Sequence, residues 1–547
     1  MLCTPAPLNG ALASNVRRRM ALKDLLERGY FPKELPRPFV TVDFAALMST
    51  GSPAPGDWGK PPTKKGKPRS GKVDPYSLAR GGLLRRGLAI CNPLHYFQLA
   101  REIDTNWAAI LPKVSGTAIA ATSPEWKSSG RAIDGRNAQS ERPRMARETR
   151  LGRRYILRTD ISRFYHSIYT HSLAWALHTK SVAKANHKMT LLGNRLDVLI
   201  RNGQDAQTIG VPIGPDTSLL AAELIMQRCD EQLALKISSL KGHRFIDDYE
   251  LAFLSRTEAE DAFHLLEACL AEYELALNPK KTDVLELPLP FEATWATELK
   301  RMPIRAMGSA QAADLHAIFN RAFELHLQFP EEAVLQFLLG RLRHAAVTPA
   351  NWPLFQILVL NCIVPEPATL PYALEQLIIR INAGAVPMRD EISEILNLLV
   401  RTHAPRGHTS EVANSLWGCL ALEIPLESDA VAAVSRFDSS AVALLALDLQ
   451  SYGFTAVPLD TTIWEAHMTG DGLYDSHWLL AYEANIKGWL PSKSGVDHVM
   501  ADPIFAHLKS HGVSFYDRRL AKAPPMTKKV LPTLPTVSTV GGGGGSP

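Results

Sequence analysis

Two neighbouring acids interrupt an apolar stretch that reads Arg244-Phe245-Ile246-Asp247-Asp248-Tyr249-Glu250-Leu251-Ala252-Phe253. The pattern predicts a tight β-hairpin whose tip presents Asp247 and Asp248. Neighbouring carboxylates repel each other and are costly to bury, so a divalent cation is their usual partner. Mg²⁺ is typically held by a few carboxylates together with substrate phosphates. Taken alone, an Asp-Asp pair also fits an ordinary surface turn, so the rest of the chain has to decide.

A third acid ends the run Tyr155-Ile156-Leu157-Arg158-Thr159-Asp160. Its β-branched and aromatic residues predict a strand that ends at Asp160, followed by a turn and a helix from about 170 to 180. An acid at a strand end beside an acidic hairpin suits two-metal phosphoryl transfer, in which one ion activates the attacking hydroxyl and the other stabilises the leaving oxygen. The alternative is that Asp160 only caps the following turn.

A Gly/Pro loop lies between the two acidic segments and reads Gly210-Val211-Pro212-Ile213-Gly214-Pro215-Asp216-Thr217-Ser218. The apolar run over 219–225 predicts that the loop opens a helix. Glycines let backbone or a flat ligand approach closely, and the first turns of such a helix can support a nucleotide base. As a bare pattern the loop is a weak signal, because many turns look like it.

The order of these segments resembles the palm of a reverse transcriptase. Asp160 with Phe164 and Tyr165 resembles motif A, residues 210–218 resemble motif B, and Phe245-Ile246-Asp247-Asp248 resembles motif C. Motif D is matched by Leu277-Asn278-Pro279-Lys280-Lys281-Thr282. The resemblance implies that the enzyme uses two Mg²⁺ ions, with Mn²⁺ as an alternative. The implied catalytic and metal-binding residues are Asp160, Asp247 and Asp248, with Ile161 as a further metal ligand.

The same resemblance implies a nucleotide site. Lys281 is expected beside the phosphates of the incoming nucleotide, and the Tyr165 ring is expected to crowd the 2′-carbon of its sugar. A ring there disfavours ribose, so the substrates are expected to be dNTPs and the product DNA. Many reverse transcriptases start motif B with Gln-Gly, whereas Gln207 here is displaced from Gly210. The implied nucleotide-binding residues are Phe164, Tyr165, Gly210, Pro212, Gly214, Ser218 and Lys281.

Two longer runs are similar to the bacterial abortive-infection and defence-associated reverse transcriptases, the AbiK-like group. They are Asp160-Ile161-Ser162-Arg163-Phe164-Tyr165-His166-Ser167-Ile168-Tyr169-Thr170-His171 and Leu25-Leu26-Glu27-Arg28-Gly29-Tyr30-Phe31-Pro32-Lys33-Glu34-Leu35-Pro36. This resemblance implies antiphage defence in the bacterial cytoplasm by a closed homo-oligomer, a trimer or hexamer. Some relatives copy an associated noncoding RNA, and others add nucleotides without a template to a protein hydroxyl. Candidate primers by residue type and location are Tyr452, Tyr474, Tyr482 and Tyr516.

Basic residues crowd the segment before motif A. Between Lys127 and Arg158 the chain has nine arginines against three acids. Arginine pairs with phosphates bidentately, which favours contacts to nucleic acid over a merely solvated basic face. A second basic stretch, 60–72, either tracks a phosphate backbone or is a plain flexible insertion. The predicted nucleic-acid contacts are Arg131, Arg136, Arg150, Arg154 and Arg158.

Length and composition set the domain organisation. A chain of 547 residues, 46% apolar and with a formal charge of +5, suggests two to four domains of a globular protein. From about 309 to 520 the apolar spacing is near 3.6, which predicts successive amphipathic helices in a HEAT-like array or a compact bundle. The predicted fold class is α+β, with right-hand-like fingers and an antiparallel palm sheet followed by an all-α HEAT-like repeat domain. The predicted parts are 1–150 (N-terminal extension and fingers), 151–300 (palm), 301–520 (helical repeat) and 521–547 (tail with a linker-like end).

Other protein classes fit the sequence less well. No apolar run is long enough to span a bilayer, and the first twenty residues lack the core of a signal peptide. The six cysteines form no Cys-x-x-Cys pair, which argues against a cysteine zinc site or a disulfide framework. Two alternatives stay open. One is a nucleic-acid-binding scaffold with a vestigial palm, which the three acids and Lys281 disfavour. The other is a retron- or intron-type reverse transcriptase, which the long helical half disfavours.

Overall fold

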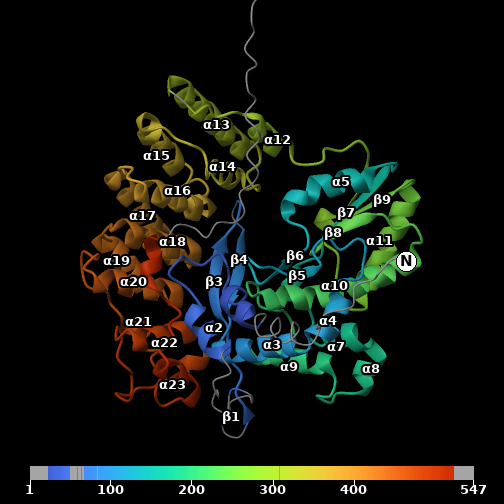
Figure 1. Cartoon of the computed structure of the whole chain (residues 1–547), viewed down its shortest axis with the longest axis horizontal. Helices are drawn as coiled ribbons and strands as arrows, with labels where there is room; N and C mark the ends of the chain where they lie inside the picture. Colours follow the sequence, from blue (N-terminus) through green and yellow to red (C-terminus); the bar gives the residue numbers. More distant parts are fainter. Residues whose placement is uncertain are drawn as a thin grey trace, which may run out of the picture.

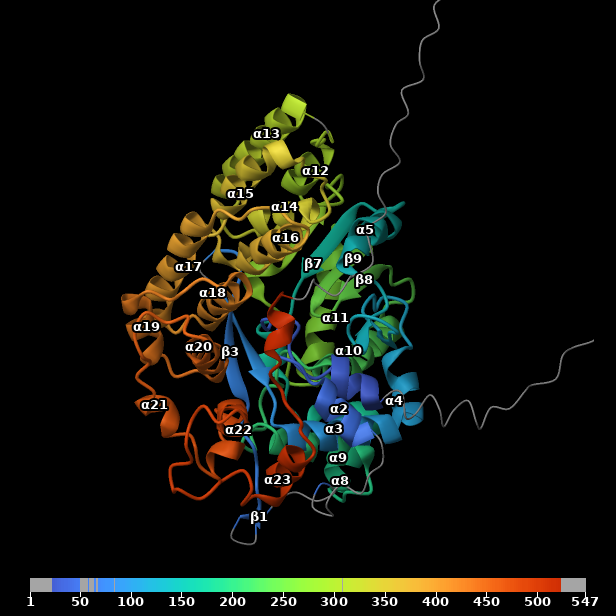
Figure 2. The same ribbon diagram turned by 60° about the vertical axis from the view of Figure 1, so that its left-hand side comes forward.

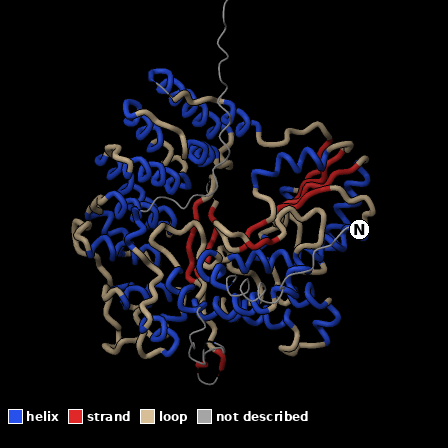
Figure 3. Tube along the Cα trace, viewed as in Figure 1, coloured by secondary structure: helices blue, strands red, loops and turns tan. Residues whose placement is uncertain are grey.

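The first half of the chain mixes helices and strands, whereas the second half is built from helices (Figure 3). The computed structural model describes residues 22–49, 58, 63–64, 67–82, 84–306 and 308–522. Residues 60–62 and 65–66 of the basic stretch predicted at 60–72, and the tail from 523 onward, lie outside the described residues. The predicted domain boundaries stay predictions.

A four-stranded antiparallel sheet carries the acidic segments. Its strand order is β10-β7-β9-β8. The strand predicted to end at Asp160 is confirmed as β7, which ends one residue earlier, at Thr159. The predicted hairpin is confirmed as β8 and β9 joined by Ile246 and Asp247. Ile246 has a φ of 58°, so the turn uses a left-handed residue as two-residue hairpin turns do. The strands are β7 (Tyr155–Thr159), β8 (Gly242–Phe245), β9 (Asp248–Phe253) and β10 (Asp283–Glu286).

Helices on both sides hold this sheet in place. Helix α11 packs against β7, β9 and β10 and also against α10, whereas α5 packs against β8 and β9. Helix α11 starts with a capping box in which Ser255 and Glu258 satisfy each other's backbone N–H groups. The palm helices are α6 (Phe164–Ser167), α7 (Ser172–His178), α8 (Lys180–Ala185), α9 (Leu192–Asn202), α10 (Asp216–Lys236) and α11 (Arg256–Ala271).

One fully buried arginine ties the hairpin to helix α10. The Arg244 side chain on β8 is 0% exposed, and its Nη2 lies 2.9 Å from Glu223 Oε2 and 2.7 Å from Asp230 Oδ2. The Tyr249 hydroxyl on β9 donates to Asp230 Oδ1 at 2.8 Å, and the backbone N–H of Ile246 donates to Thr122 Oγ1 at 2.8 Å. Two acids of one helix therefore fix both strands of the hairpin, including the residue before Asp247.

The β3–β4 hairpin lies between the palm and the helical half (Figure 1). Arg85 on β4 donates to both carboxylate oxygens of Glu411 in α18, at 2.6 and 2.8 Å. At the hairpin tip, a Cβ on Gly81 would lie 2.8 Å from the backbone oxygen of Glu331, so only glycine fits this approach. The hairpin thus belongs structurally to the helical half as much as to the segment before the palm, which the predicted 1–150 domain did not anticipate.

The remaining elements before the palm are short. A helix covers residues 22–28, and β5 pairs with β6 beside α10. These elements are α2 (Val42–Ser49), β1 (Thr63–Lys64), β2 (Lys67–Pro68), β3 (Asp74–Ala79), β4 (Arg85–Ile90), α3 (Pro93–Thr105), α4 (Trp107–Val114), β5 (Pro124–Trp126), β6 (Ile133–Gly135) and α5 (Arg142–Arg150).

The second half forms two layers of helices (Figure 2). Helices α13, α15, α17 and α19 line one edge, and α14, α16, α18 and α20 lie behind them, with neighbours two apart in sequence packed together. The HEAT-like character of this array stays a prediction. None of the helices that the structure describes is long and apolar enough to cross a bilayer. The helices are α12 (Thr294–Arg301), α13 (Gly308–Gln328), α14 (Val334–Leu342), α15 (Trp352–Leu360), α16 (Leu370–Asn382), α17 (Arg389–His403), α18 (Thr409–Leu422), α19 (Ser428–Ser435), α20 (Ser440–Ser451), α21 (Thr462–Glu465), α22 (Trp478–Ile486) and α23 (Pro503–Ser510).

The buried Arg244 network makes a stability prediction. Arg244→Met removes the charge and leaves Glu223 and Asp230 buried without their cation, which costs about 3–5 kcal/mol. We expect a lower melting temperature by differential scanning calorimetry. The control is Arg256→Met, because Arg256 forms an exposed pair with Glu260 and exposed pairs contribute about 0–1 kcal/mol. Equal melting temperatures for Arg244→Met and the wild type would contradict this account.

Candidate active site

Three carboxylates meet where the central strands end. Residue Thr159 of β7 pairs with Tyr249 of β9, so Asp160 follows its strand at the level of Asp247 and Asp248. Asp160 is 6% exposed. Burial raises the pKa of Asp247 to about 6, and the charges of Asp248 and Asp160 raise it further against a weaker effect of its own backbone. The structure therefore brings together all three acids that the sequence singled out.

Two basic side chains balance part of this charge. The Lys281 Nζ lies 2.6 Å from Asp160 Oδ2, and this hydrogen bond raises the pKa of Lys281. Arg142, at the start of α5, places its Nη2 2.6 Å from Asp248 Oδ2 and its guanidinium 4.6 Å from the centre of the Phe245 ring. Asp248 is thus engaged on the α5 side of the hairpin, and Asp247 is left facing Asp160.

The residues present fit hard divalent cations. Within the described residues, Asp160 Oδ1 is buried and has no hydrogen-bond partner, which leaves an oxygen donor in a crowded acidic site. Asp247 contributes a second carboxylate whose ionised form is unfavourable without a cation. Carboxylate oxygens are the ligands that Mg²⁺ prefers. Ile161 is buried and forms a bridge with Leu277, and its predicted part in metal binding stays a prediction.

The motif B loop is fastened to the turn after β7. Gly210 and Gly214 have φ angles of 90° and 132°, which side-chain-bearing residues rarely adopt. The backbone N–H of Val211 donates to the carbonyl of Tyr165 at 2.9 Å. A Cβ on Gly214 would lie 2.6 Å from the Pro32 ring. Backbone contacts therefore set the position of the loop relative to motif A.

A glutamine braces this loop, although it is not Gln207. The Gln204 Nε2 donates to the carbonyl oxygens of Gly210 at 2.8 Å and Gln207 at 2.9 Å. At the other end of the loop, the Ser218 hydroxyl donates to the carbonyl of Pro212. The side chain of Ser218 is thus used within the loop, whereas the sequence indicated a role at the nucleotide.

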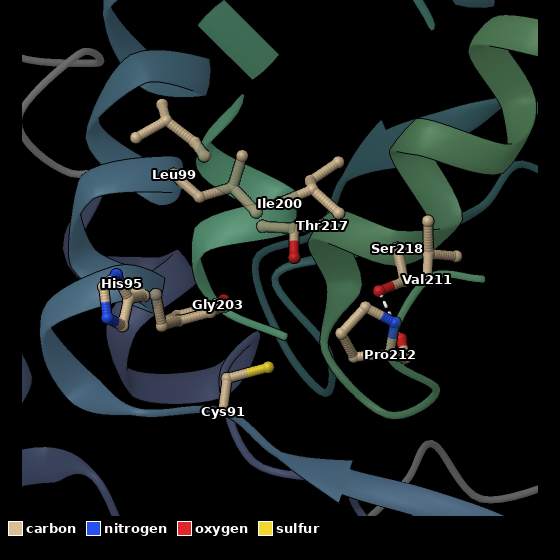
Figure 4. A pocket seen from close by; sticks show the side chains of 11 residues that line it. Cys91, His95, Leu99, Ile200, Gly203, Val211, Pro212, Thr217 and Ser218 are labelled. Carbon is tan, nitrogen blue, oxygen red and sulfur yellow. Dashed lines mark hydrogen bonds between the residues drawn. The ribbon is translucent and has the colours of Figure 1, made fainter. Parts of the chain in front are cut away.

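A small internal cavity lies behind the loop, between α3 and α9. Figure 4 shows the side chains of Cys91, His95, Thr217 and Ser218 around it. Its volume of about 20 Å³ suits a single water molecule. Burial lowers the pKa of His95 to about 4, so this imidazole is neutral at physiological pH.

The two rings after Asp160 differ in their surroundings. Phe164 is buried in the core, with its ring centre 5.4 Å from that of Tyr165. Burial raises the pKa of Tyr165 most, and the charges of Glu223 and Asp247 add to this. The Tyr165 ring therefore lies within electrostatic reach of Asp247. Phe164 is a core residue that packs against the Tyr165 ring.

Comparison with known proteins identifies the domain around these residues. Residues 103–308 match the family described as reverse transcriptase (RNA-dependent DNA polymerase). The chain contains a reverse transcriptase domain. As an enzyme, it is a reverse transcriptase, and the matched region contains all three acids, the motif B loop and Lys281.

Comparisons beyond the domain are weaker. No curated protein matches the sequence significantly. Among solved structures, apo telomerase from Candida tropicalis is similar with a TM-score of 0.31 and 12% identity over 59% of this chain and 67% of that chain. Telomerase from Candida albicans in complex with a TWJ fragment of telomeric RNA has a TM-score of 0.26 and 10% identity over 60% of this chain and 62% of that chain. These TM-scores are too low to assign any property of the two telomerases to this chain.

Two of the predicted nucleic-acid contacts, Arg131 and Arg150, are engaged within the fold, and their contact with nucleic acid stays a prediction. Arg131 donates to Asp216 at 2.5 Å and to three backbone carbonyls, which leaves no side of its guanidinium for a phosphate. Arg150 is buried against Glu250, with Nε–Oε1 at 2.8 Å, and also donates to the carbonyl of Leu289. Both residues join segments of the fold.

The other three arginines keep exposed side chains. Arg136, Arg154 and Arg158 each form an ion pair with one glutamate while remaining at the surface. The pairs of Arg136 and Arg154 are exposed on both sides, and such pairs are weak and can be exchanged for a phosphate, whereas the partner of Arg158 is the buried Glu250. Their contact with nucleic acid stays a prediction.

Two arginines of the β3–β4 hairpin that the sequence analysis missed, Arg80 and Arg86, lie within electrostatic reach of the reverse transcriptase site. Burial and the nearby Arg86 lower the pKa of Arg80, whereas the charge of Asp247 raises it. The positive charge of Arg86 in turn contributes to lowering the pKa of Tyr165 and that of His166. Within the described part of the chain, neither guanidinium has an ion-pair partner. The sequence signal was available as Arg80-Gly81-Gly82-Leu83-Leu84-Arg85-Arg86, in which a Gly-Gly turn lies between arginines.

Three of the four predicted primer tyrosines are buried. The Tyr482 hydroxyl donates to the carbonyl of Val513 at 2.7 Å, and the Tyr516 hydroxyl donates to Asp448 at 2.7 Å. Tyr474 is also in the core. A buried, hydrogen-bonded hydroxyl cannot reach the catalytic acids without unfolding its surroundings, which argues against these three as primers. Tyr452 is 62% exposed and directly follows α20.

The crowded acids make a prediction about stability. A pKa raised from 3.8 to about 6 means that ionised Asp247 is less stable in the folded protein than in the unfolded chain by about 3 kcal/mol. The penalty is complete above pH 6 and absent below pH 3.8. In EDTA, we expect Asp247→Asn to melt at a higher temperature than the wild type at pH 7.5, with the difference vanishing as the pH falls toward 4.

The control for this experiment is Asp283→Asn, which alters an exposed carboxylate of β10 in the same sheet. It should leave the melting temperature unchanged at both pH values. A destabilised Asp247→Asn protein at pH 7.5 in EDTA would show that the carboxylates are not under mutual repulsion.

Proposed function

We propose that this reverse transcriptase polymerises deoxynucleotides at the site formed by Asp160, Asp247 and Asp248. The observation that carries the proposal is the convergence of three carboxylates from two adjacent strand ends, with one buried oxygen of Asp160 left without a partner among the described residues. An ordinary surface turn does not place a buried carboxylate beside two further acids. The cost of the arrangement is explained when cations bind there.

The chain's own residues would divide the work as follows. Asp160 and Asp247 hold the ions, and Asp248, paired with Arg142, fixes the hairpin. Bound divalent ions lower the pKa of the attacking hydroxyl and stabilise the leaving oxygen. The hydroxyl oxygen forms a bond to the α-phosphorus of the dNTP, the bond from that phosphorus to the bridging oxygen breaks, and pyrophosphate leaves. When the dNTP binds, the Lys281 ammonium leaves its ion pair with Asp160 and pairs with a phosphate of the nucleotide. Catalysis then consists mainly of positioning the reactants and stabilising charge.

Two groups of side chains would recognise the nucleotide. Arg80 and Arg86 carry positive charge over the site from the β3–β4 hairpin and suit a triphosphate. Tyr165 acts on the sugar side, where its ring excludes a 2′-hydroxyl. The glycines at 210 and 214 let the motif B backbone approach the base.

The biological role is proposed from the two longer runs that resemble the AbiK-like group, 25–36 and 160–171. We infer antiphage defence in the bacterial cytoplasm by a homo-oligomer whose helical half is a HEAT-like array. The template is either an associated noncoding RNA or absent. The β3–β4 hairpin contacts the helical half as well as the segment before the palm. This contact favours a helical half that is coupled structurally to the polymerase.

The test is incorporation of labelled dNTPs by the purified chain with Mg²⁺. We expect Asp160→Asn and Asp247→Asn to lose activity by on the order of 1,000-fold, because each removes an ion ligand. Asp283→Asn should retain full activity. Tyr165→Ala should incorporate ribonucleotides that the wild type rejects. Activity that survives in both acid variants would overturn the proposed site, and a wild type inactive on every template would favour a vestigial palm.

Two further readouts separate the finer proposals. Sequencing of the product distinguishes a copy of one fixed RNA from random DNA attached to the protein. Phage plating on cells that carry the wild type or Asp247→Asn tests the defence role. Equal protection by the two would mean that defence does not depend on DNA synthesis.

A further inference from the structure

Three side chains converge in the helical half, far along the chain from the polymerase motifs. Asp438 lies between α19 and α20, His467 follows α21, and His477 is the N-cap of α22. The Nε2 atoms of the two histidines lie 2.9 and 3.2 Å from the same oxygen, Asp438 Oδ1. The two rings stack with centres 3.9 Å apart. All three potential ligand atoms lie within 4.8 Å of one another.

The donor set suits a borderline divalent cation of the Zn²⁺ class. Two imidazole nitrogens and one carboxylate oxygen are ligands that Zn²⁺ binds in proteins, and Mg²⁺ prefers oxygen alone. The Asp438 side chain is 48% exposed, whereas those of His467 and His477 are 24% and 12% exposed. Water can therefore reach the carboxylate side as a fourth ligand.

The surrounding structure holds these ligands in place. The Trp464 indole donates to the carbonyl of Phe437, the residue before Asp438, at 3.0 Å. The Trp478 indole, next to His477, donates to the carbonyl of Ile90 at 3.0 Å. Both indoles are completely buried. Because the neighbours of two ligands are anchored in the core, the site needs little ordering when an ion binds.

The second nitrogen of His477 also has a partner. The Nδ1 of His477 lies 3.2 Å from the Ser476 hydroxyl. An outer hydrogen bond of this kind orients a histidine and leaves its Nε2 for a metal ion. The buried side chain of Asp74 on β3 also acts electrostatically on His477.

We propose that Asp438, His467 and His477 form a structural binding site for one Zn²⁺-class ion at the junction of the helical half and the segment before the palm. The segment that it would fix, 466–478, carries several contacts across this junction. Asp471 pairs with Arg69 at 2.9 Å, and Asp475 pairs with Lys72 at 2.9 Å. The ion would stabilise these contacts and takes no part in nucleotide transfer.

A second histidine cluster serves as the comparison. His403, His408 and Glu411 also gather potential ligands, with the two Nδ1 atoms 2.9 Å apart. Both carboxylate oxygens of Glu411, however, accept from Arg85 at 2.6 and 2.8 Å. A metal ion there would face a guanidinium and would have to break a buried ion pair. This cluster holds β4 against α18 through the Arg85–Glu411 ion pair. Substitutions of its histidines therefore serve as controls for substitutions at the proposed metal site.

The experiment is a calorimetric titration of Zn²⁺ into the full chain after EDTA removal, with excess Mg²⁺ present to occupy the polymerase acids. We expect one Zn²⁺ per chain with a Kd of about 10 µM or tighter. Zn²⁺ at about 100 times its Kd should raise the melting temperature by about 2–5 °C. Co²⁺ in its place should give the visible absorption of a four-coordinate ion.

Three variants locate the site. His467→Gln keeps a donor for Asp438 but removes the imidazole ligand, so it should lose the bound Zn²⁺ while melting like the EDTA-treated wild type. His408→Gln, in the comparison cluster, should bind as the wild type does. Asp247→Asn should also bind normally. Absence of stoichiometric binding in the wild type, undiminished binding in His467→Gln, or loss of binding in Asp247→Asn would overturn the proposal.

Discussion

The buried contact between Arg244 and the two acids of helix α10 is the interaction on which the active site depends. Helix α10 begins at the motif B loop, and Arg244 precedes the acidic turn by two residues. Because Glu223 and Asp230 both pair with this one guanidinium, the loop and the turn are held by the same helix. A buried ion pair of this kind is weak evidence for net stability, but it strongly opposes any arrangement that separates its members. Its value here is geometric, since it fixes Asp247 relative to Gly210–Ser218.

Charge balance governs the rest of the site. Three carboxylates lie together, and Lys281 and Arg142 each neutralise one of them. Asp247 is left with a raised pKa, and the orphaned oxygen of Asp160 lies buried near it. An arrangement that is unfavourable by itself becomes favourable when cations and a triphosphate bind. Arg80 and Arg86, which form no ion pair with any residue that the structure describes, add positive charge that suits phosphates.

The sequence predicted the parts of the site that depend on local pattern. The turn at Ile246-Asp247, the strand ending at Asp160 and the Gly/Pro loop follow from spacing along a few residues. The arginines were harder, because Arg131 and Arg136 look alike in sequence while only long-range packing places the first against Asp216. The burial of Tyr482 and Tyr516 depends in the same way on segments about thirty and seventy residues away. Local signals therefore identify chemistry, and tertiary contacts decide which side chains are free to perform it.

The central claim is that Asp160 and Asp247 together hold the divalent ions of a polymerase. Electron paramagnetic resonance of Mn²⁺ with a non-hydrolysable deoxynucleotide triphosphate measures this directly, because it counts bound ions without requiring turnover. The account predicts two Mn²⁺ per wild-type chain and at most one in Asp160→Asn or Asp247→Asn. Two Mn²⁺ bound equally by the wild type and by both variants would contradict it.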